Sequence, residues 1–182
     1  MTGKYLLYGT LAAGATLFAW QTVSNVVIPW HEATMTNFPD NGSIVTAVRA
    51  NAPRNGVYYS PNGILAAVSM TPDLANKENA MGAMMGRQVA IDIVAALLLC
   101  VLVVRIGART RGETALILAL GGLVAGMIRE FSDWNWYGFA GSYALVNTID
   151  LTISLALAGF VIALIRDRQM GGEARVNAVS AS

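Results

Sequence analysis

The amino-acid sequence predicts an all-α membrane protein with four transmembrane helices and a small folded loop on the outer side. Two observations predict this class. Of the 182 residues, 55% are hydrophobic and only 13% are charged, whereas about 25% of residues are charged in an ordinary soluble domain. The apolar residues are also gathered into long uncharged runs instead of being spread at amphipathic spacing. We therefore expect a single membrane domain over residues 1–182.

Four segments are long enough to cross a bilayer, because a helix rises about 1.5 Å per residue and needs roughly 20 apolar residues to cross the hydrocarbon core. The expected spans are residues 5–28, 84–106, 114–131 and 143–165. The third span has a short apolar run that ends at Ile128, so it must include Arg129–Phe131 or thin the membrane locally. The first run is longer than the apolar region of a signal peptide, so we interpret it as a retained span.

Lysine and arginine residues indicate the orientation of the spans, because short basic loops stay in the cytoplasm. Seven basic residues next to the expected spans fall on one side of the membrane: Lys4, Arg105, Arg109, Arg111, Arg166, Arg168 and Arg175. We therefore expect both termini to be cytoplasmic and the chain to lie in the inner membrane of a bacterium.

Residues 29–82 form the one large loop outside the expected spans, and their pattern predicts a folded unit. Ser43 is the expected N-cap of a short helix through Ile44–Val48, which ends before Pro53. Gly56–Tyr59 and Ile64–Val68 have strand propensity and flank a turn sequence. A β-hairpin is therefore expected in this loop.

Aromatic residues are concentrated at the outer ends of the expected spans. They comprise Trp30, next to His31, and then Trp134, Trp136, Tyr137 and Phe139 in the expected second outer loop, residues 131–141. Such residues are typical of a membrane-interface belt. The alternative is a docking surface for another membrane subunit or a quinone headgroup. His31 is in reach of this aromatic loop or of Glu130, and its expected role is hydrogen bonding.

Polar side chains lie within the outer halves of the expected spans, where an ionisable group usually faces the protein interior. Asp92, Asp150 and Gln21 are expected at one level, roughly 10 Å below the outer edge. Helical spacing adds Gln88, Asn25 and Asn147, and Arg129 lies just above. One interpretation is a structural hydrogen-bond network in which Arg129 pairs with Asp92 or Asp150. The others are a water-accessible site that binds a cation or relays a proton, and a ligand pocket.

Small residues four positions apart indicate where helices approach one another closely. Gly122 and Gly126 have this spacing in the third span, Gly9 and Ala13 in the first, and Gly159 and Ala163 in the fourth. We expect these pairs to serve packing within the chain, with oligomerisation as the alternative.

Several classes of protein are excluded by the residues that the chain contains. The net charge of +1 offers no basic face for nucleic acid. Cys100 is the single cysteine and His31 the single histidine, so dithiol chemistry and histidine-rich metal sites are not possible. The sequence has no Ser/His/Asp order and no Gly-rich phosphate loop. We therefore predict no catalytic residues, no metal and no cofactor.

Three short motifs carry a resemblance. They are Pro29–Trp30–His31, then Asn51–Ala52–Pro53 with Gly56–Val57–Tyr58, and Trp134–Asn135–Trp136–Tyr137–Gly138–Phe139 followed by Asp150. The combination resembles an uncharacterised group of small bacterial inner-membrane proteins. The resemblance covers most of the chain and implies four spans, but that group has no assigned activity and so implies no catalytic residues.

The expected function is that of a non-catalytic accessory subunit in a respiratory or photosynthetic complex of the inner membrane. Its expected partners are membrane lipids and a larger membrane-protein complex. The alternative is a stand-alone protein that binds or moves a proton or small cation at Asp92 and Asp150. A membrane enzyme acting on a lipid or quinone headgroup near His31 is a third hypothesis.

Overall fold

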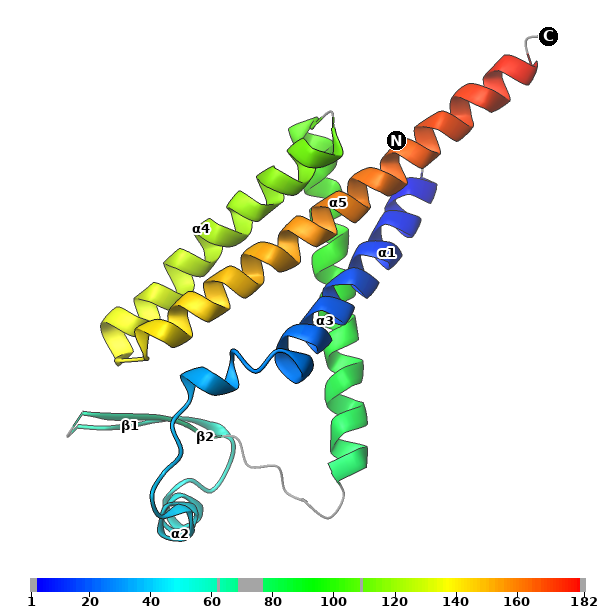
Figure 1. Ribbon diagram of the computed structural model, residues 1–182. Coiled ribbons are helices and arrows are strands. Elements are labelled where there is room, and N and C mark those ends of the chain that lie inside the picture. Colours follow the sequence, from blue (N-terminus) through cyan, green and yellow to red (C-terminus); the bar gives the residue numbers. More distant parts are fainter. Residues whose placement is uncertain (1–2, 62, 69–76, 109, 181–182) are drawn as a thin grey trace. The chain divides into compact units, whose positions relative to one another are not determined.

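The computed structural model (Figure 1) describes residues 3–61, 63–68, 77–108 and 110–180, which belong to two compact units. One unit comprises Met1–Thr34 together with Met85–Ser182, and it is helical. The other unit, Met35–Met84, contains a short helix and a β-hairpin.

The helical unit is built on four long helices. They are α1 (Gly3–Thr22), which continues directly into a π-helical turn (Val23–Val27), α3 (Lys77–Ile106), α4 (Arg111–Tyr137) and α5 (Gly141–Ser180). Among the described residues, three helical stretches are long and apolar enough to cross a membrane: Met81–Ile106, Arg111–Tyr137 and Gly141–Gln169. Helix α1 is not among these stretches, and Lys4, Gln21 and several glycines and threonines lie among its apolar residues. The helical class and three helices of membrane-spanning length and hydropathy are thus confirmed, and the four-span topology stays a prediction.

Helix α4 extends further at its C-terminal end than the sequence predicts. Thr110 and Glu113 form a capping box at its start, and Gly138 ends it in the left-handed conformation with φ 72°. Phe131 and Trp134, one helical turn apart, stack edge to face with ring centroids 6.2 Å apart. The expected loop over residues 131–141 is therefore wrong, because these ring contacts and the glycine cap extend the helix to Tyr137.

Helices α4 and α5 approach each other closely at glycines. A Cβ atom on Gly122 would lie 2.8 Å from the carbonyl oxygen of Leu151, and one on Gly126 would lie 2.9 Å from Cα of Thr148. Helices α1 and α3 are similarly close, since a Cβ on Gly14 would lie 2.7 Å from Cδ1 of Ile93. The expected packing of small residues within the chain is confirmed at these glycines.

The core of the helical unit takes residues from all four helices. Its buried members are Tyr5, Ala13, Leu17, Ala96, Cys100, Val103, Leu118, Ala158 and Ile162. Small side chains are numerous among them, which lets the helix axes lie close together.

The second unit contains α2 (Asn41–Asn51) and an antiparallel hairpin of β1 (Gly56–Ser60) and β2 (Ile64–Val68). In the hairpin Gly56 pairs with Val68 and Ser60 with Ile64. Gly63 takes a positive φ of 89° in the turn. The predicted hairpin is confirmed, because its turn has a glycine where the left-handed conformation is needed.

The N-cap of α2 is Asp40, so the predicted Ser43 cap is wrong. The Asp40 side chain accepts a hydrogen bond from the backbone N–H of Ser43 at 3.1 Å and another from its hydroxyl at 2.5 Å. Helical geometry therefore starts at Asn41, and Ser43 donates to the cap. The Ser43 hydroxyl, and then its backbone N–H, hold the pKa of Asp40 below its ordinary value.

Candidate functional site

Two carboxylates are bound by neighbouring residues at the C-terminal end of α1. Trp20 donates to Asp150 of α5, and Gln21 donates to Asp92 of α3. Consecutive residues of a helix point about 100° apart, so these two side chains reach different neighbours. The end of α1 is thereby attached to α3 on one side and to α5 on the other.

The Asp92 cluster consists of Gln21, Gln88 and Asp92. The Asp92 residue is only 2% exposed. Its Oδ1 accepts hydrogen bonds from Nε2 of Gln21 and from Nε2 of Gln88, both at 3.0 Å. Its Oδ2 is buried and has no hydrogen-bond partner among the described residues. A buried carboxylate oxygen without a hydrogen-bond partner is costly, which makes Oδ2 the unsatisfied polar atom of this cluster.

The Asp150 cluster consists of Trp20, Ser24, Trp30, His31 and Asp150. Oδ1 of Asp150 accepts from the Trp20 indole N–H at 2.6 Å, and Oδ2 lies 3.3 Å from Nε2 of His31. The side chains of His31 and Asp150 keep 12% and 15% of their surface exposed. A proton on Nε2 makes this contact attractive, because an unprotonated Nε2 would point its lone pair at Oδ2. Asp150 thus has a partner for each oxygen.

The π-helical turn after α1 arranges the rest of this cluster. The Ile28 N–H donates to the Val23 carbonyl at 3.0 Å, which is the wider π spacing. The next carbonyl, that of Ser24, would meet Pro29 at the same spacing, and proline has no N–H to give. The Trp30 indole N–H takes this place and donates to the carbonyl and hydroxyl oxygens of Ser24, at 3.1 and 3.0 Å. The Ser24 hydroxyl lies 3.1 Å from Nε2 of His31.

Three other residues of the predicted polar layer make local contacts instead. Asn25 donates to the Gln21 carbonyl and Asn147 to the Tyr143 carbonyl, each within its own helical segment. Arg129 forms an ion pair with Asp133, N to O 2.6 Å, and its side chain is 70% exposed. The expected pairing of Arg129 with Asp92 or Asp150 is therefore wrong, since a carboxylate one turn along α4 is nearer.

The predicted docking residues fall into two places. Trp30 and His31 belong to the Asp150 cluster, and His31 contacts Asp150 where the aromatic loop or Glu130 was expected. The other four, Trp134, Trp136, Tyr137 and Phe139, lie exposed on the last turns of α4 and in the turn after it.

Sequence reasoning missed Trp20 and Ser24 as members of the site. Each has one polar group, an indole N–H in Trp20 and a hydroxyl in Ser24, on an otherwise uncharged stretch of the first span. Hydropathy alone therefore does not indicate that they belong to a polar site. Their spacing is a usable signal, because Trp20 and Ser24 are four residues apart and share one face of the helical segment.

The described part of the chain contains no group of three His, Cys, Asp or Glu side chains placed to hold a metal ion. Neither a protein-family model nor a curated protein nor a solved structure matches the chain. The site is therefore interpreted from its own chemistry.

Proposed function

We propose that the chain is a four-span protein of the bacterial inner membrane that serves as a non-catalytic accessory subunit of a larger respiratory or photosynthetic assembly. The observation that carries this proposal is the sparse packing of two long helices. Within the chain, only 22% of the most apolar stretch of α3 and of α4 is buried, compared with 33% for α5. Most of the lateral surface of α3 and α4 is therefore available to lipid or to other membrane helices.

The length of the first helical segment supports a fourth span. Helix α1 has 20 residues, and the π-helical turn adds five without a break. Such a segment can cross the roughly 30 Å hydrocarbon core. Its residues Tyr5, Ala13 and Leu17 share one core with helices that are apolar enough to span. Basic residues at the shared end of these helices, including Lys4 and Arg168, support cytoplasmic termini.

An apolar stripe on α4 is the surface that fits a partner helix. The stripe comprises Leu116, Leu120, Leu123 and Met127, which follow one another at spacings of three and four residues. All four are exposed, and the exposed Trp134, seven residues after Met127, continues the same face toward the end of α4. Aromatic residues of this kind are enriched where protein surfaces dock.

The two carboxylate clusters support the same proposal, because their polar groups bond mainly to one another. Gln21, Gln88, Trp20 and His31 are all directed at Asp92 or Asp150. Such bonds specify which helices are neighbours, whether or not they add net stability. In this role the clusters hold the end of α1 against α3 and α5.

The test compares membranes from cells with and without the gene by separating intact complexes and measuring the amount and turnover of each. We expect one larger complex to lose abundance while its turnover per remaining complex is unchanged. Unchanged amounts of every complex would contradict the proposal.

A pair of variants then tests the docking face. Leu120→Trp enlarges the α4 stripe and should fail to restore the complex, whereas Leu98→Trp, on an exposed part of α3, should restore it. Equal restoration by both variants would remove the stripe from the proposal.

One observation favours a second function, a stand-alone protein that binds or moves a proton or small cation. It is the buried Oδ2 of Asp92, for which the described residues supply no partner. The test reconstitutes wild type, Asp92→Asn and Asp150→Asn in vesicles and measures proton and alkali-cation uptake. Loss of uptake in either variant would support this function, and equal uptake in all three proteins would eliminate it.

A further inference from the structure

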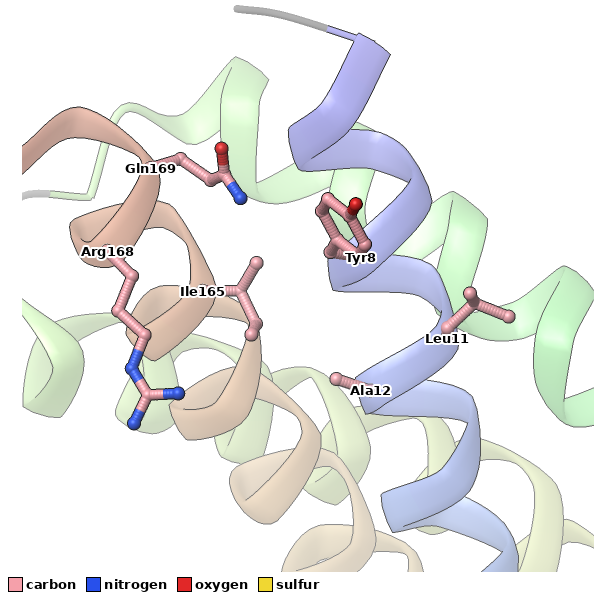
Figure 2. A pocket seen from close by; sticks show the side chains of 6 residues that line it. All are labelled: Tyr8, Leu11, Ala12, Ile165, Arg168 and Gln169. Carbon is pink, nitrogen blue, oxygen red and sulfur yellow. The ribbon is translucent and has the colours of Figure 1, made fainter. Parts of the chain in front are cut away.

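A groove between α1 and α5 lies far from the carboxylate clusters, toward the start of α1 (Figure 2). Its volume is about 560 Å³, and its lining residues are Tyr8, Leu11, Ala12, Ile165, Arg168 and Gln169. Figure 2 shows Tyr8, Leu11 and Ala12 on the α1 wall, and Ile165, Arg168 and Gln169 on the α5 wall. The two helices run antiparallel here, because the start of α1 lies beside the late part of α5.

The groove combines polar groups with an apolar floor. The Tyr8 hydroxyl and the Gln169 amide stand toward the start of α1, whereas the Arg168 side chain extends along α5 so that its guanidinium lies lower, near the level of Ala12 (Figure 2). Leu11, Ala12 and Ile165 lie one turn deeper along the same helices and form an apolar floor. This combination suits a phospholipid, whose polar headgroup is joined to apolar acyl chains.

Positive charge at this end of the helices is in excess. Asp167 is engaged by two arginines, with Arg111 at 2.7 Å and Arg166 at 3.2 Å. Arg168 is exposed and lines the groove, and Lys4 is exposed one turn before Tyr8 on the same face of α1. Within the described residues neither Arg168 nor Lys4 forms an ion pair. Among the described side chains, the groove therefore has cations at its rim that form no ion pair with a carboxylate.

We propose that this groove binds one anionic phospholipid. Arg168, with Gln169 and the Tyr8 hydroxyl, donates to the phosphate, Lys4 adds charge, and an acyl chain lies along Leu11, Ala12 and Ile165. Basic pockets between membrane helices bind acidic headgroups for this reason, and guanidinium-to-phosphate hydrogen bonds are strong ones. The apolar floor favours a lipid over free phosphate. The site is independent of the carboxylate clusters and of the accessory role.

The test titrates the full chain in detergent micelles with phosphatidylglycerol or phosphatidylcholine of equal acyl length and counts retained lipids by native mass spectrometry. We expect one phosphatidylglycerol to be retained in preference to phosphatidylcholine. Arg168→Ala should weaken its binding on the order of fivefold, since one cation near an acidic lipid contributes about that factor, and Arg168→Lys should restore part of it. Inorganic phosphate should not compete.

Two further variants separate this site from general surface charge. Arg105→Ala removes an exposed cation of α3 that does not line the groove, so it should leave retention unchanged. Ala12→Phe fills the floor and keeps every charge, so it should abolish retention while helicity by circular dichroism stays at the wild-type level. Equal retention of the two lipids, equal losses in Arg168→Ala and Arg105→Ala, or normal retention in Ala12→Phe would each overturn the proposal.

Discussion

The contact between helices α4 and α5 differs in kind from the contacts that the end of α1 makes with α3 and α5. The α4–α5 contact depends on backbone approach at Gly122 and Gly126, where there is no room for a Cβ atom. The end of α1 is attached instead through side-chain hydrogen bonds to Asp92 and Asp150. The first contact is limited by shape, whereas the second depends on hydrogen bonds to two carboxylates. The chain thus combines a fixed helical pair with an attachment made by polar side chains.

The two attachments of α1 also differ from each other. Asp150 has an N–H partner at each oxygen and keeps some solvent access. Asp92 is buried, has neutral amide donors at one oxygen, and has no partner for the other within the described chain. The two clusters therefore differ in how fully the carboxylate oxygens are satisfied, since both oxygens of Asp150 have polar contacts and only one oxygen of Asp92 does.

The largest loss of stability is expected from disrupting the close contact between α4 and α5. Gly126→Leu would force a side chain into Cα of Thr148, so we expect a loss of about 1–3 kcal/mol in the free energy of unfolding. The measurement is denaturant unfolding in micelles followed by circular dichroism. Gly121→Leu is the control on the same helix, because a Cβ there meets nothing within 4 Å. Equal losses in the two variants would contradict the close approach.

The second-largest loss of stability is expected from weakening the hydrogen bonds to Asp150. Asp150→Asn removes the charge from the bonds to Trp20 and His31, and hydrogen bonds to charged groups contribute about 1.5–3 kcal/mol. We expect a loss within that range in the same unfolding measurement. Asn147→Ala is the control on α5, because Asn147 bonds only to the Tyr143 carbonyl among the described residues. A smaller loss for Asp150→Asn than for the control would contradict the cluster.

Asp92→Asn should lower the free energy of unfolding by less than Asp150→Asn does. The pair of variants therefore tests the difference between the two clusters. Its Oδ1 can still accept from Gln21 and Gln88, and the change removes a poorly solvated charge. We expect a change in unfolding free energy of about 1 kcal/mol or less. A loss larger than that of Asp150→Asn would show that Asp92, and not Asp150, carries the stabilising charge.

The smallest effect lies outside the helical unit, at the cap of α2. The pKa of Asp40 is lowered by the Ser43 hydroxyl and amide. A lowered pKa means that the stabilisation is complete above the ordinary carboxyl pKa and is lost as pH falls through the lowered value. We expect the amide of Ser43 to lose hydrogen-exchange protection under acid conditions. Asp40→Asn keeps an acceptor without the titration, so protection in that variant should not change over the same pH range once intrinsic exchange rates are taken into account.

The features that composition and local spacing determine were predictable from the sequence. Hydropathy identifies the three helices that are long and apolar enough to cross a membrane, and the turn glycine at Gly63 accompanies the predicted hairpin. The close approaches at Gly122 and Gly126 also follow from their spacing. Each of these features depends on residues near one another in the chain.

The features that were not predictable depend on choices between competing partners. Arg129 could reach a carboxylate on another helix or Asp133 on its own, and the local pair forms. The division of the polar residues into an Asp92 cluster and an Asp150 cluster depends on how α1 is rotated, which spacing does not fix. The Trp30 contact follows from a carbonyl that Pro29 cannot satisfy, and that requires knowledge of the π-helical turn.

Native mass spectrometry of the chain, extracted gently from its own membrane at its natural level of expression, tests the accessory role most directly. We expect the protein to co-purify with a larger membrane complex in a fixed stoichiometric ratio. A bare monomer or homo-oligomer would contradict that role, and Asp92 and Asp150 would then be studied as a proton or cation site.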